Sequence, residues 1–185
     1  MKKVTIYKGF HRPFSLIPAC FRNISRIRSY KKQIISKSII FTDSCRYILD
    51  GEDQYDWNKL FGICFGWRGI HKNSARFVWR YNVATDRIDI ATYYYIDGNR
   101  EFEKVVSLCL NTRTKFEIER EGNKVWFYVN DEFMDFNDAF KTERCMLTFG
   151  CGLYFGGNRR APQDIIIYKE CKVKIVYSML NGIFE

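Results

Sequence analysis

The chain has 185 residues, of which 46% are hydrophobic and 28% are charged, and its formal net charge is +9. This length and composition are typical of one globular domain with a sizeable core, which excludes a disordered chain and leaves little room for a second domain. No run approaches the roughly 20 apolar residues that a membrane-spanning helix needs, so we expect no membrane span.

Positive charge is concentrated at the N-terminus. Residues 1–42 hold ten lysines and arginines and no acidic residue, whereas the rest of the chain holds 20 basic and 21 acidic residues. We therefore separate a basic N-terminal segment, residues 1–36, from a domain at residues 37–185. Such asymmetry predicts an anionic neighbour, which can be nucleic acid, an acidic polysaccharide, a membrane surface or an acidic protein. A solvated face that aids solubility explains the same charges.

Within the basic segment, alternating residues predict a short strand at 3–7. Pro13 and Pro18 exclude a helix between them. Isoleucines spaced three or four apart at 21–35 fit an amphipathic helix, and because isoleucine is β-branched they fit a strand as well. Both interpretations stay open for this stretch.

From Lys37 onward the hydrophobic pattern has a period of two, and the 17% aromatic content also favours strands. The Asp-Gly pair at 97–98 and the Gly-Asn pair at 122–123 are typical of hairpin turns, whereas 133–140 fits a short helix or a loop. Regular short strands without alternating helices predict an all-β fold, an antiparallel β-sandwich of the jelly-roll kind. The predicted strands are 38–42, 45–49, 59–67, 76–82, 87–96, 102–110, 115–121, 124–130, 145–149, 164–168 and 172–177.

Cysteine and acidic residues give no metal motif. The seven cysteines are odd in number and form no Cys-x-x-Cys pair, which argues against a metal site and a disulfide framework. They fit buried thiols in a reducing compartment. Oxygen ligands are dense at 50–56, but the spacing of a known calcium loop is missing. We expect no metal and no cofactor.

Three stretches carry a resemblance: Asp-Trp-Asn-Lys-Leu-Phe-Gly at 56–62, the run from His71 to Arg80, and Tyr-Phe-Gly-Gly-Asn at 154–158 with the Ala-Pro pair that follows. They resemble uncharacterised jelly-roll proteins of Bacteroidetes and of the phages that infect them, which are similar to the concanavalin A-like lectin and glucanase superfamily. The resemblance runs from about residue 38 to residue 168. It implies a sandwich of two curved sheets and no particular activity.

The densest polar group is the loop at 70–74 with the strand that follows it. Alternation puts Arg76 and Arg80 on one sheet face, about 7 Å apart, where two guanidinium groups can clamp a carboxylate or a sulfate. If the next strand pairs with this one, its tyrosines lie beside the arginines, and we choose Tyr94 among them. The candidate binding residues are His71, Asn73, Arg76, Arg80, Tyr94, Asn158 and Arg159.

We expect a non-enzymatic binding or structural module that presents this face to a glycan or to another protein. The resemblance makes a phage or virion association the natural setting, with the basic segment contacting nucleic acid or an acidic protein. Since no secretory signal opens the chain, we expect a cytoplasmic or virion-associated protein.

The alternative is a polysaccharide lyase that acts on an acidic polysaccharide. Such an enzyme needs a group that neutralises the uronate and a Tyr or His that moves the proton. Jelly-roll alginate lyases carry a Gln-Ile-His motif, and the matching residues here are Gly69, Ile70 and His71, while their arginine-rich and Tyr-Lys motifs have no counterpart. For a lyase, the catalytic residues would be His71, Arg76, Arg80 and Tyr94.

Overall fold

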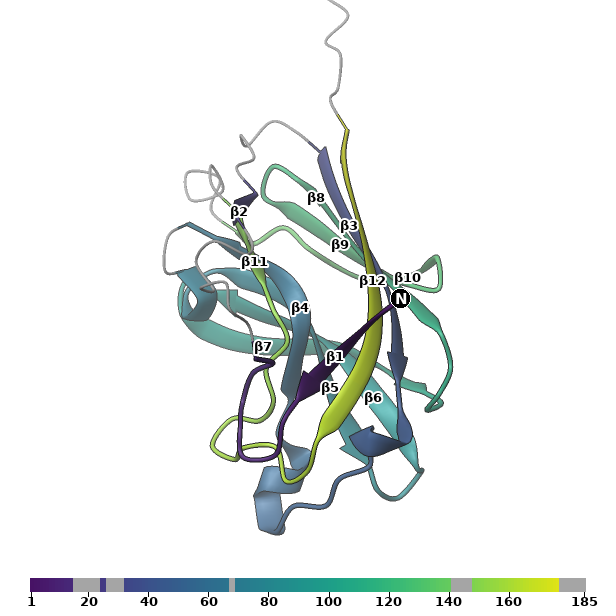
Figure 1. The fold of residues 1–185 in the computed structure, drawn as a ribbon. Helices are drawn as coiled ribbons and strands as arrows, with labels where there is room; N and C mark the ends of the chain where they lie inside the picture. The colour runs from purple at the N-terminus through teal and green to yellow at the C-terminus, as the bar shows by residue number, and fades with distance from the viewer. Residues whose placement is uncertain (15–23, 26–31, 67–68, 141–147, 177–185) are drawn as a thin grey trace, which may run out of the picture.

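The structure is a computed structural model that describes residues 1–14, 24–25, 32–66, 69–140 and 148–176. Two six-stranded sheets of antiparallel strands form the fold in this part of the chain (Figure 1). This confirms the predicted antiparallel β-sandwich. Sheet A runs through β1 (Lys2–Ile6), β12 (Ile165–Val176), β3 (Lys32–Phe41), β8 (Thr114–Glu121), β9 (Lys124–Val129) and β10 (Glu132–Asn137). Sheet B runs through β2 (Ile24–Ser25), β11 (Thr148–Cys151), β4 (Asn58–Phe65), β5 (Ser74–Asn82), β6 (Arg87–Ile96) and β7 (Asn99–Leu108). The loops hold the 3-10 helices η1 (Asp43–Cys45), η2 (Gly51–Tyr55) and η3 (Gly69–His71).

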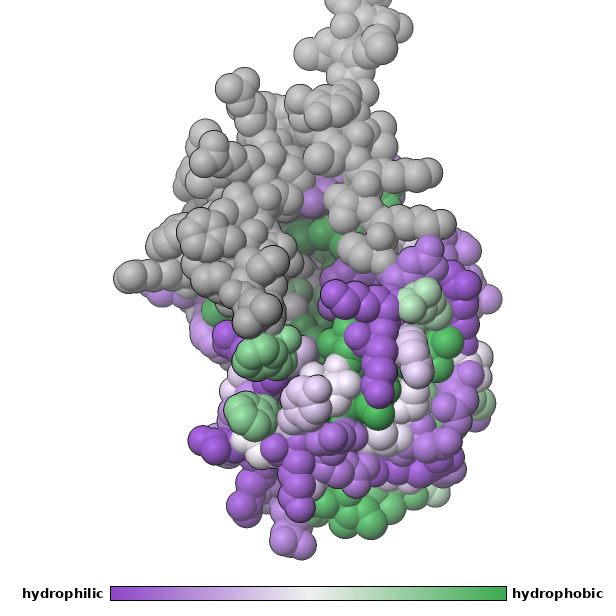
Figure 2. All heavy atoms as spheres, viewed as in Figure 1, coloured by the Kyte–Doolittle hydropathy of each residue, from purple (hydrophilic) through white to green (hydrophobic). Residues whose placement is uncertain are grey.

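The core lies between the two sheets and is rich in aromatic rings. The period-two pattern turns Phe77 and Trp79 of β5 inward, where both are fully buried. Phe77 meets Phe116 of β8 at 5.2 Å and Phe127 of β9 at 4.8 Å between ring centroids, edge-on in both cases. Such pairs each stabilise the fold by about 0.5–1.5 kcal/mol beyond burial. Hydrophilic residues make up much of the described surface in Figure 2, as expected when the apolar side chains face inward.

The described strands of the basic segment are divided between the sheets: β1 and the first part of β3 belong to sheet A, and β2 belongs to sheet B. β1 pairs with β12 along the edge of the sheet, and Ile6 is fully buried. The expected boundary between residues 36 and 37 lies inside β3, whose first residue, Lys32, forms an ion pair with Glu119 at 2.5 Å. Much of the stretch at 21–35 lies outside the described residues. Contact of the basic segment with nucleic acid or an acidic protein stays a prediction.

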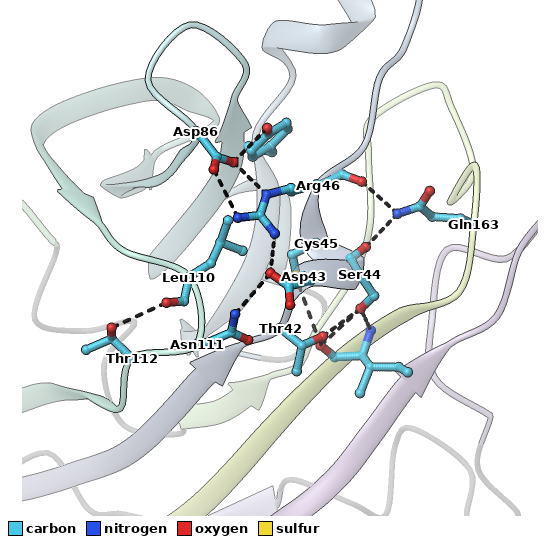
Figure 3. A network of polar contacts seen from close by, with 12 residues as sticks. Thr42, Asp43, Ser44, Cys45, Arg46, Asp86, Leu110, Asn111, Thr112 and Gln163 are labelled. Atoms are coloured by element: carbon cyan, nitrogen blue, oxygen red, sulfur yellow. Dashed lines mark hydrogen bonds and ion pairs between the residues drawn. The ribbon is translucent and has the colours of Figure 1, made fainter.

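The predicted strand at 45–49 is wrong, because the chain there has no regular structure after η1. Side chains satisfy its polar groups instead (Figure 3). The side-chain amide of Gln163 donates to the carbonyls of Ser44 at 2.8 Å and Arg46 at 2.7 Å. The Arg46 guanidinium in turn pairs with Asp86 at 2.6 Å. A segment whose carbonyls bond to side chains serves as a connector between sheets rather than as a strand.

A hairpin replaces the helix or loop predicted at 133–140, since β10 pairs with β9. Asn130 and Asp131 between these strands have positive φ angles of 53° and 67°, which is the conformation of a tight hairpin turn. A bulge lies between Phe133 and Asp135 and breaks the alternation. The Asn-Asp turn lacks the glycine of the usual hairpin signal, and the bulge hides the period of two.

The two closing strands predicted at 164–168 and 172–177 are one strand, β12. It pairs with β3 from Ile167, opposite Phe41, to Val176, opposite Lys32. A partner along this whole length keeps the polar residues in the middle of β12 extended.

Among the described residues, no helix is long and apolar enough to cross a membrane. The cysteines whose side chains are described, at 45, 64, 109 and 151, form no disulfide. Burial raises the pKa of the Cys45 thiol to about 12, so this residue acts as a small hydrophobic group. The cytoplasmic or virion-associated location stays a prediction.

Candidate functional site

A cluster of cations and aromatic rings lies on the outer face of sheet B, the face turned away from the core. Gly62 of β4 lies opposite Arg76 of β5. On its other side Arg76 lies opposite Tyr93 of β6, and Tyr93 lies opposite Phe102 of β7. Residues directly opposite each other in antiparallel strands share a face, so these four form one row. We use "outer face of sheet B" for this row and its neighbours Trp57, Lys59, His71, Arg80, Tyr95 and Arg100.

Arg76 is the centre of the cluster and is only 2% exposed. Its guanidinium lies 4.8 Å from the ring centroid of Tyr93 and 5.4 Å from that of Tyr95. One guanidinium nitrogen donates to the carbonyl of Ile70 at 3.2 Å, whereas Nε is buried without a hydrogen-bond partner. Within the described part of the chain, no carboxylate pairs with Arg76. A buried guanidinium without a counter-charge is costly, so this position favours an incoming anion.

Gly62 makes room for this arginine. A Cβ atom at position 62 would lie 2.5 Å from Cγ of Arg76 and 2.3 Å from the carbonyl oxygen of Ala75. Both distances are too short for real contacts. The side chain of Arg76 therefore packs against Gly62 in space that any side chain at position 62 would occupy.

Lys59 reaches the same face through a β-bulge. The register of β4 against β5 shifts between Lys59 and Phe61, and this extra residue turns Lys59 away from the core. Its ammonium donates to the carbonyl of Trp57 at 2.7 Å and lies 5.9 Å from the ring of Tyr93. Burial, and then the charge of Arg76, lower the pKa of Lys59 to about 8. At neutral pH Lys59 is thus mostly charged, and it loses its proton in mild alkali.

His71 and Tyr95 are the more accessible groups of the cluster, with His71 exposed and Tyr95 half-buried. The His71 ring lies edge-on to the Tyr95 ring at 5.5 Å. Burial, and then the charges of Arg76 and Lys59, lower the pKa of His71, so its imidazole is neutral at neutral pH. Burial and a hydrogen bond with Tyr95 raise the pKa of Tyr93, so this phenol stays protonated. The face combines fixed cations with a neutral base and phenol groups.

Arg76 and Arg80 share this face, as alternation predicts, but they differ in whether a carboxylate neutralises their charge. Arg80 Nε lies 3.4 Å from a carboxylate oxygen of Asp89, and the two form an ion pair. The Arg80 guanidinium also lies 4.3 Å from the ring centroid of Trp57. The charge of Arg80 is therefore neutralised by Asp89, and its guanidinium helps to hold Trp57 in place. The charge of Arg76 can instead interact with a ligand.

Tyr94 does not belong to this face, so its assignment is wrong. β6 turns it into the core, where it is fully buried and its hydroxyl donates to Asp135 at 2.7 Å. Because Arg76 lies opposite Tyr93 in the β5–β6 hairpin, Tyr93 and Tyr95 occupy the place that we assigned to Tyr94.

Asn73 is buried and organises the loop that carries His71. Its side-chain oxygen accepts a hydrogen bond from the backbone N–H of Asp97 at 3.1 Å, and its carbonyl accepts one from Phe65 at 2.9 Å. These bonds tie the loop to the β6–β7 turn and to β4. We therefore assign Asn73 a positioning role in place of ligand contact.

Asn158 and Arg159 are exposed in a loop beside the cluster. Arg159 pairs with Asp53 at 2.7 Å. The loop borders the site because the carbonyl of Gly156 lies 3.5 Å from the ammonium of Lys59. Ligand binding by Asn158 and Arg159 stays a prediction.

The residues closest to Arg76 include Lys59, Tyr93 and Tyr95, which are not among those expected from the sequence. The tyrosines carry a usable signal, because in the β5–β6 hairpin an even-numbered residue always lies opposite an odd-numbered one. Counting back from the turn would have paired Arg76 with Tyr93. Lys59 gives no such signal, since simple alternation places it on the core side with Phe61.

Among the described residues, no group of three or more His, Cys, Asp or Glu side chains is arranged to hold a metal ion. The acidic stretch at 50–56 forms η2, and its Asp53 pairs with Arg159.

No protein-family model and no curated protein sequence matches this chain. Solved structures match its fold. A variant of the alginate lyase Aly36B bound to an alginate trisaccharide matches with a TM-score of 0.64 at 12% identity, over 95% of this chain and 81% of that one. The family 7 alginate lyase A1-II′ bound to its substrate matches with a TM-score of 0.59 at 10% identity, over 82% and 63% of the two chains. The PL7 alginate lyase AlyA1 from Zobellia galactanivorans matches with a TM-score of 0.52 at 10% identity, over 80% and 63%.

These comparisons establish a jelly-roll β-sandwich of the kind found in alginate lyases, and this chain spans 63% of the length of two of them. The expectation of a non-enzymatic binding or structural module is corrected here, because solved structures that share the fold include several alginate lyases, which favours the alternative. No family match supports the resemblance to Bacteroidetes and phage proteins, and the phage or virion association stays a prediction.

Proposed function

We propose that this protein is a polysaccharide lyase that cleaves an acidic polysaccharide built of uronate residues. The observation that carries the proposal is Arg76, a buried guanidinium that has no carboxylate partner among the described residues, in a cluster with Lys59, His71 and Tyr95. The fold supports it, because structures of alginate lyases, one of them bound to an alginate trisaccharide, share this sandwich. Positive charge, a neutral imidazole and phenol groups are the parts that this chemistry needs.

Elimination at a uronate needs three functions. A cation must withdraw negative charge from the carboxylate, because the proton on the adjacent C5 is otherwise too weakly acidic. A base then takes the C5 proton, and the electron pair left behind forms the C4=C5 double bond. The C4–O bond breaks at the same time, and an acid donates a proton to the departing oxygen. No water is added, so the product carries an unsaturated sugar at its new end.

Lys59 and Arg76 supply the positive charge. Lys59 is half-buried and mostly protonated at neutral pH, so its ammonium can contact the carboxylate directly. Arg76 is buried and acts through its electrostatic field, which water screens only weakly at that depth. His71, neutral and exposed, takes the C5 proton, and Tyr95 beside it donates to the leaving oxygen.

Incubation with alginate and with glucuronan tests the proposal. We expect the ultraviolet absorbance of the unsaturated product to rise with time. His71→Asn removes the base and should lower kcat by about 10²–10⁴-fold. Lys72→Ala, a change at the exposed neighbouring residue, should leave the rate unchanged. A native protein that releases no unsaturated product from any polyuronate would refute the proposal.

A further inference from the structure

The outer face of sheet B continues past Arg76 into an aromatic platform formed by Trp57 and Phe102. The two ring centroids lie 6.2 Å apart and the ring planes are inclined by only 32°. Phe102 is 39% exposed and Trp57 is half-buried. Two neighbouring rings that are both partly open to solvent are suited to stack on the apolar face of a sugar ring.

Buried apolar residues hold this platform in place. Val78 and Ala91 lie on the outer side of β5 and β6, yet both are fully buried, and Trp57 packs against the small cluster that they form with Tyr93. Phe102 lies edge-on to Tyr93 at 4.7 Å. Rings that are already fixed by packing lose little freedom when a ligand stacks on them, which favours binding.

Two arginines flank the platform, and they differ in how their charges are used. Arg80 is paired with Asp89 and lies on the Trp57 ring. Arg100 is exposed, its guanidinium lies 5.3 Å from the Phe102 ring, and in the described part of the chain no carboxylate pairs with it. Arg100 is therefore the cation beside the platform that can meet a ligand carboxylate.

The platform extends the cluster across the sheet, away from Arg76. Phe102 on β7 and Arg76 on β5 are separated by β6, and two strand spacings amount to about 10 Å. We propose that Trp57, Phe102 and Arg100 form a second subsite, which binds the uronate residue next to the one being cleaved. The sugar ring stacks on Phe102 and Trp57, and its carboxylate pairs with Arg100. This inference rests on the proposed function and names a residue of the same polymer as the occupant.

Binding measurements on alginate oligosaccharides of increasing length test this subsite. A His71→Asn background keeps the ligand intact, and titration calorimetry gives the Kd. We expect Phe102→Ala and Arg100→Ala each to weaken binding of the longer oligosaccharides by about tenfold and to leave the shortest unchanged. Phe136→Ala is the matched control, since Phe136 is also 39% exposed and lies 5.3 Å from a tryptophan, Trp126, but on sheet A.

Turnover of the same ligands by the otherwise native chain separates this inference from the proposed function. Binding that depends on Phe102 without any unsaturated product would refute the lyase and keep the subsite. Unsaturated product with Kd and KM values unaffected by Phe102→Ala would refute the subsite and keep the lyase. Equal affinity for a neutral glucan would refute the role of Arg100, and a chain that neither binds nor cleaves alginate would refute both.

Discussion

The outer faces of the two sheets carry similar residue types but differ in how their charges are paired. On sheet A, Trp126 lies 5.3 Å from the exposed ring of Phe136, much as the two platform rings lie together on sheet B. Charged side chains of sheet A form ion pairs, such as Lys32 with Glu119 at 2.5 Å and Lys115 with Glu117 at 3.7 Å.

Sheet B instead leaves its central cation, Arg76, without a carboxylate partner among the described residues. Arg76 is buried with an unpartnered Nε, and burial together with the Arg76 charge lowers the pKa of Lys59 to about 8. Aromatic rings and positive charge alone therefore do not distinguish a binding face from an ordinary one. A buried cation without a counter-charge does distinguish a binding face. It lowers the stability of the folded protein, so a functional role is the better explanation for it.

Replacing the unpaired arginine should have the largest effect. We expect Arg76→Met to lower kcat/KM on a polyuronate by about 10³-fold, because the field at the carboxylate is lost. Its melting temperature should stay equal or rise, since an apolar side chain of similar volume replaces a buried unpaired charge. Lys32→Met on sheet A is the matched control and should keep full activity. A strongly lowered melting temperature in Arg76→Met would show that Arg76 is structural.

Filling the space at position 62 should have the next largest effect. Gly62→Ala places a Cβ 2.5 Å from Cγ of Arg76 and must displace the guanidinium. We expect kcat/KM to fall by about 10–100-fold through misplacement of the charge, and the free energy of unfolding to fall by about 1–3 kcal/mol from overpacking. Gly152→Ala, where a Cβ meets nothing within 4 Å, should change neither quantity. Equal effects at the two glycines would count against this explanation.

The pH dependence of activity should show the perturbed groups of sheet B. The proposed base His71 has a lowered pKa, so the acidic limb of kcat/KM should lie below pH 6.5. Lys59 is charged below its pKa of about 8 and neutral above it, so kcat/KM should fall several-fold as pH rises through 8. Lys59→Arg keeps the charge and should move the alkaline limb upward. A limb that stays in place in Lys59→Arg would rule out Lys59 as its source.

Breaking the ion pair on sheet A should have the smallest effect. Lys32→Ala removes a partly exposed pair, and such pairs contribute about 0.2–1 kcal/mol to stability. Urea unfolding should register this small loss, while kcat/KM stays constant. A loss of activity comparable to that of Arg76→Met would mean that the two faces do not differ in function.

The sandwich could be predicted from the sequence because the side chains alternate with a period of two in nearly every strand. The composition of the site could be predicted in part, since alternation puts Arg76 and Arg80 on one face and His71 in the preceding loop. The choice of Tyr94 was wrong because it depends on the register of the β5–β6 hairpin, which we did not derive from the sequence. A shift of one residue in that register moves a side chain to the other face of the sheet.

Lys59 and Gly62 could not have been found from local sequence. Lys59 depends on a bulge in β4, and alternation alone would bury it. The importance of Gly62 depends on the side chain of Arg76 on β5, which packs against it in a tertiary contact. That no carboxylate among the described residues pairs with Arg76 is likewise visible only once the strands are assembled into one sheet.

The central claim, that the outer face of sheet B performs an elimination on polyuronates, is tested most directly by the mass of the products released from alginate. Elimination yields oligosaccharides that lack one water relative to hydrolysis products. We predict such products from the native chain and a loss of nearly all of them with Arg76→Met. An intact polymer, or products that contain the added water, would contradict the account.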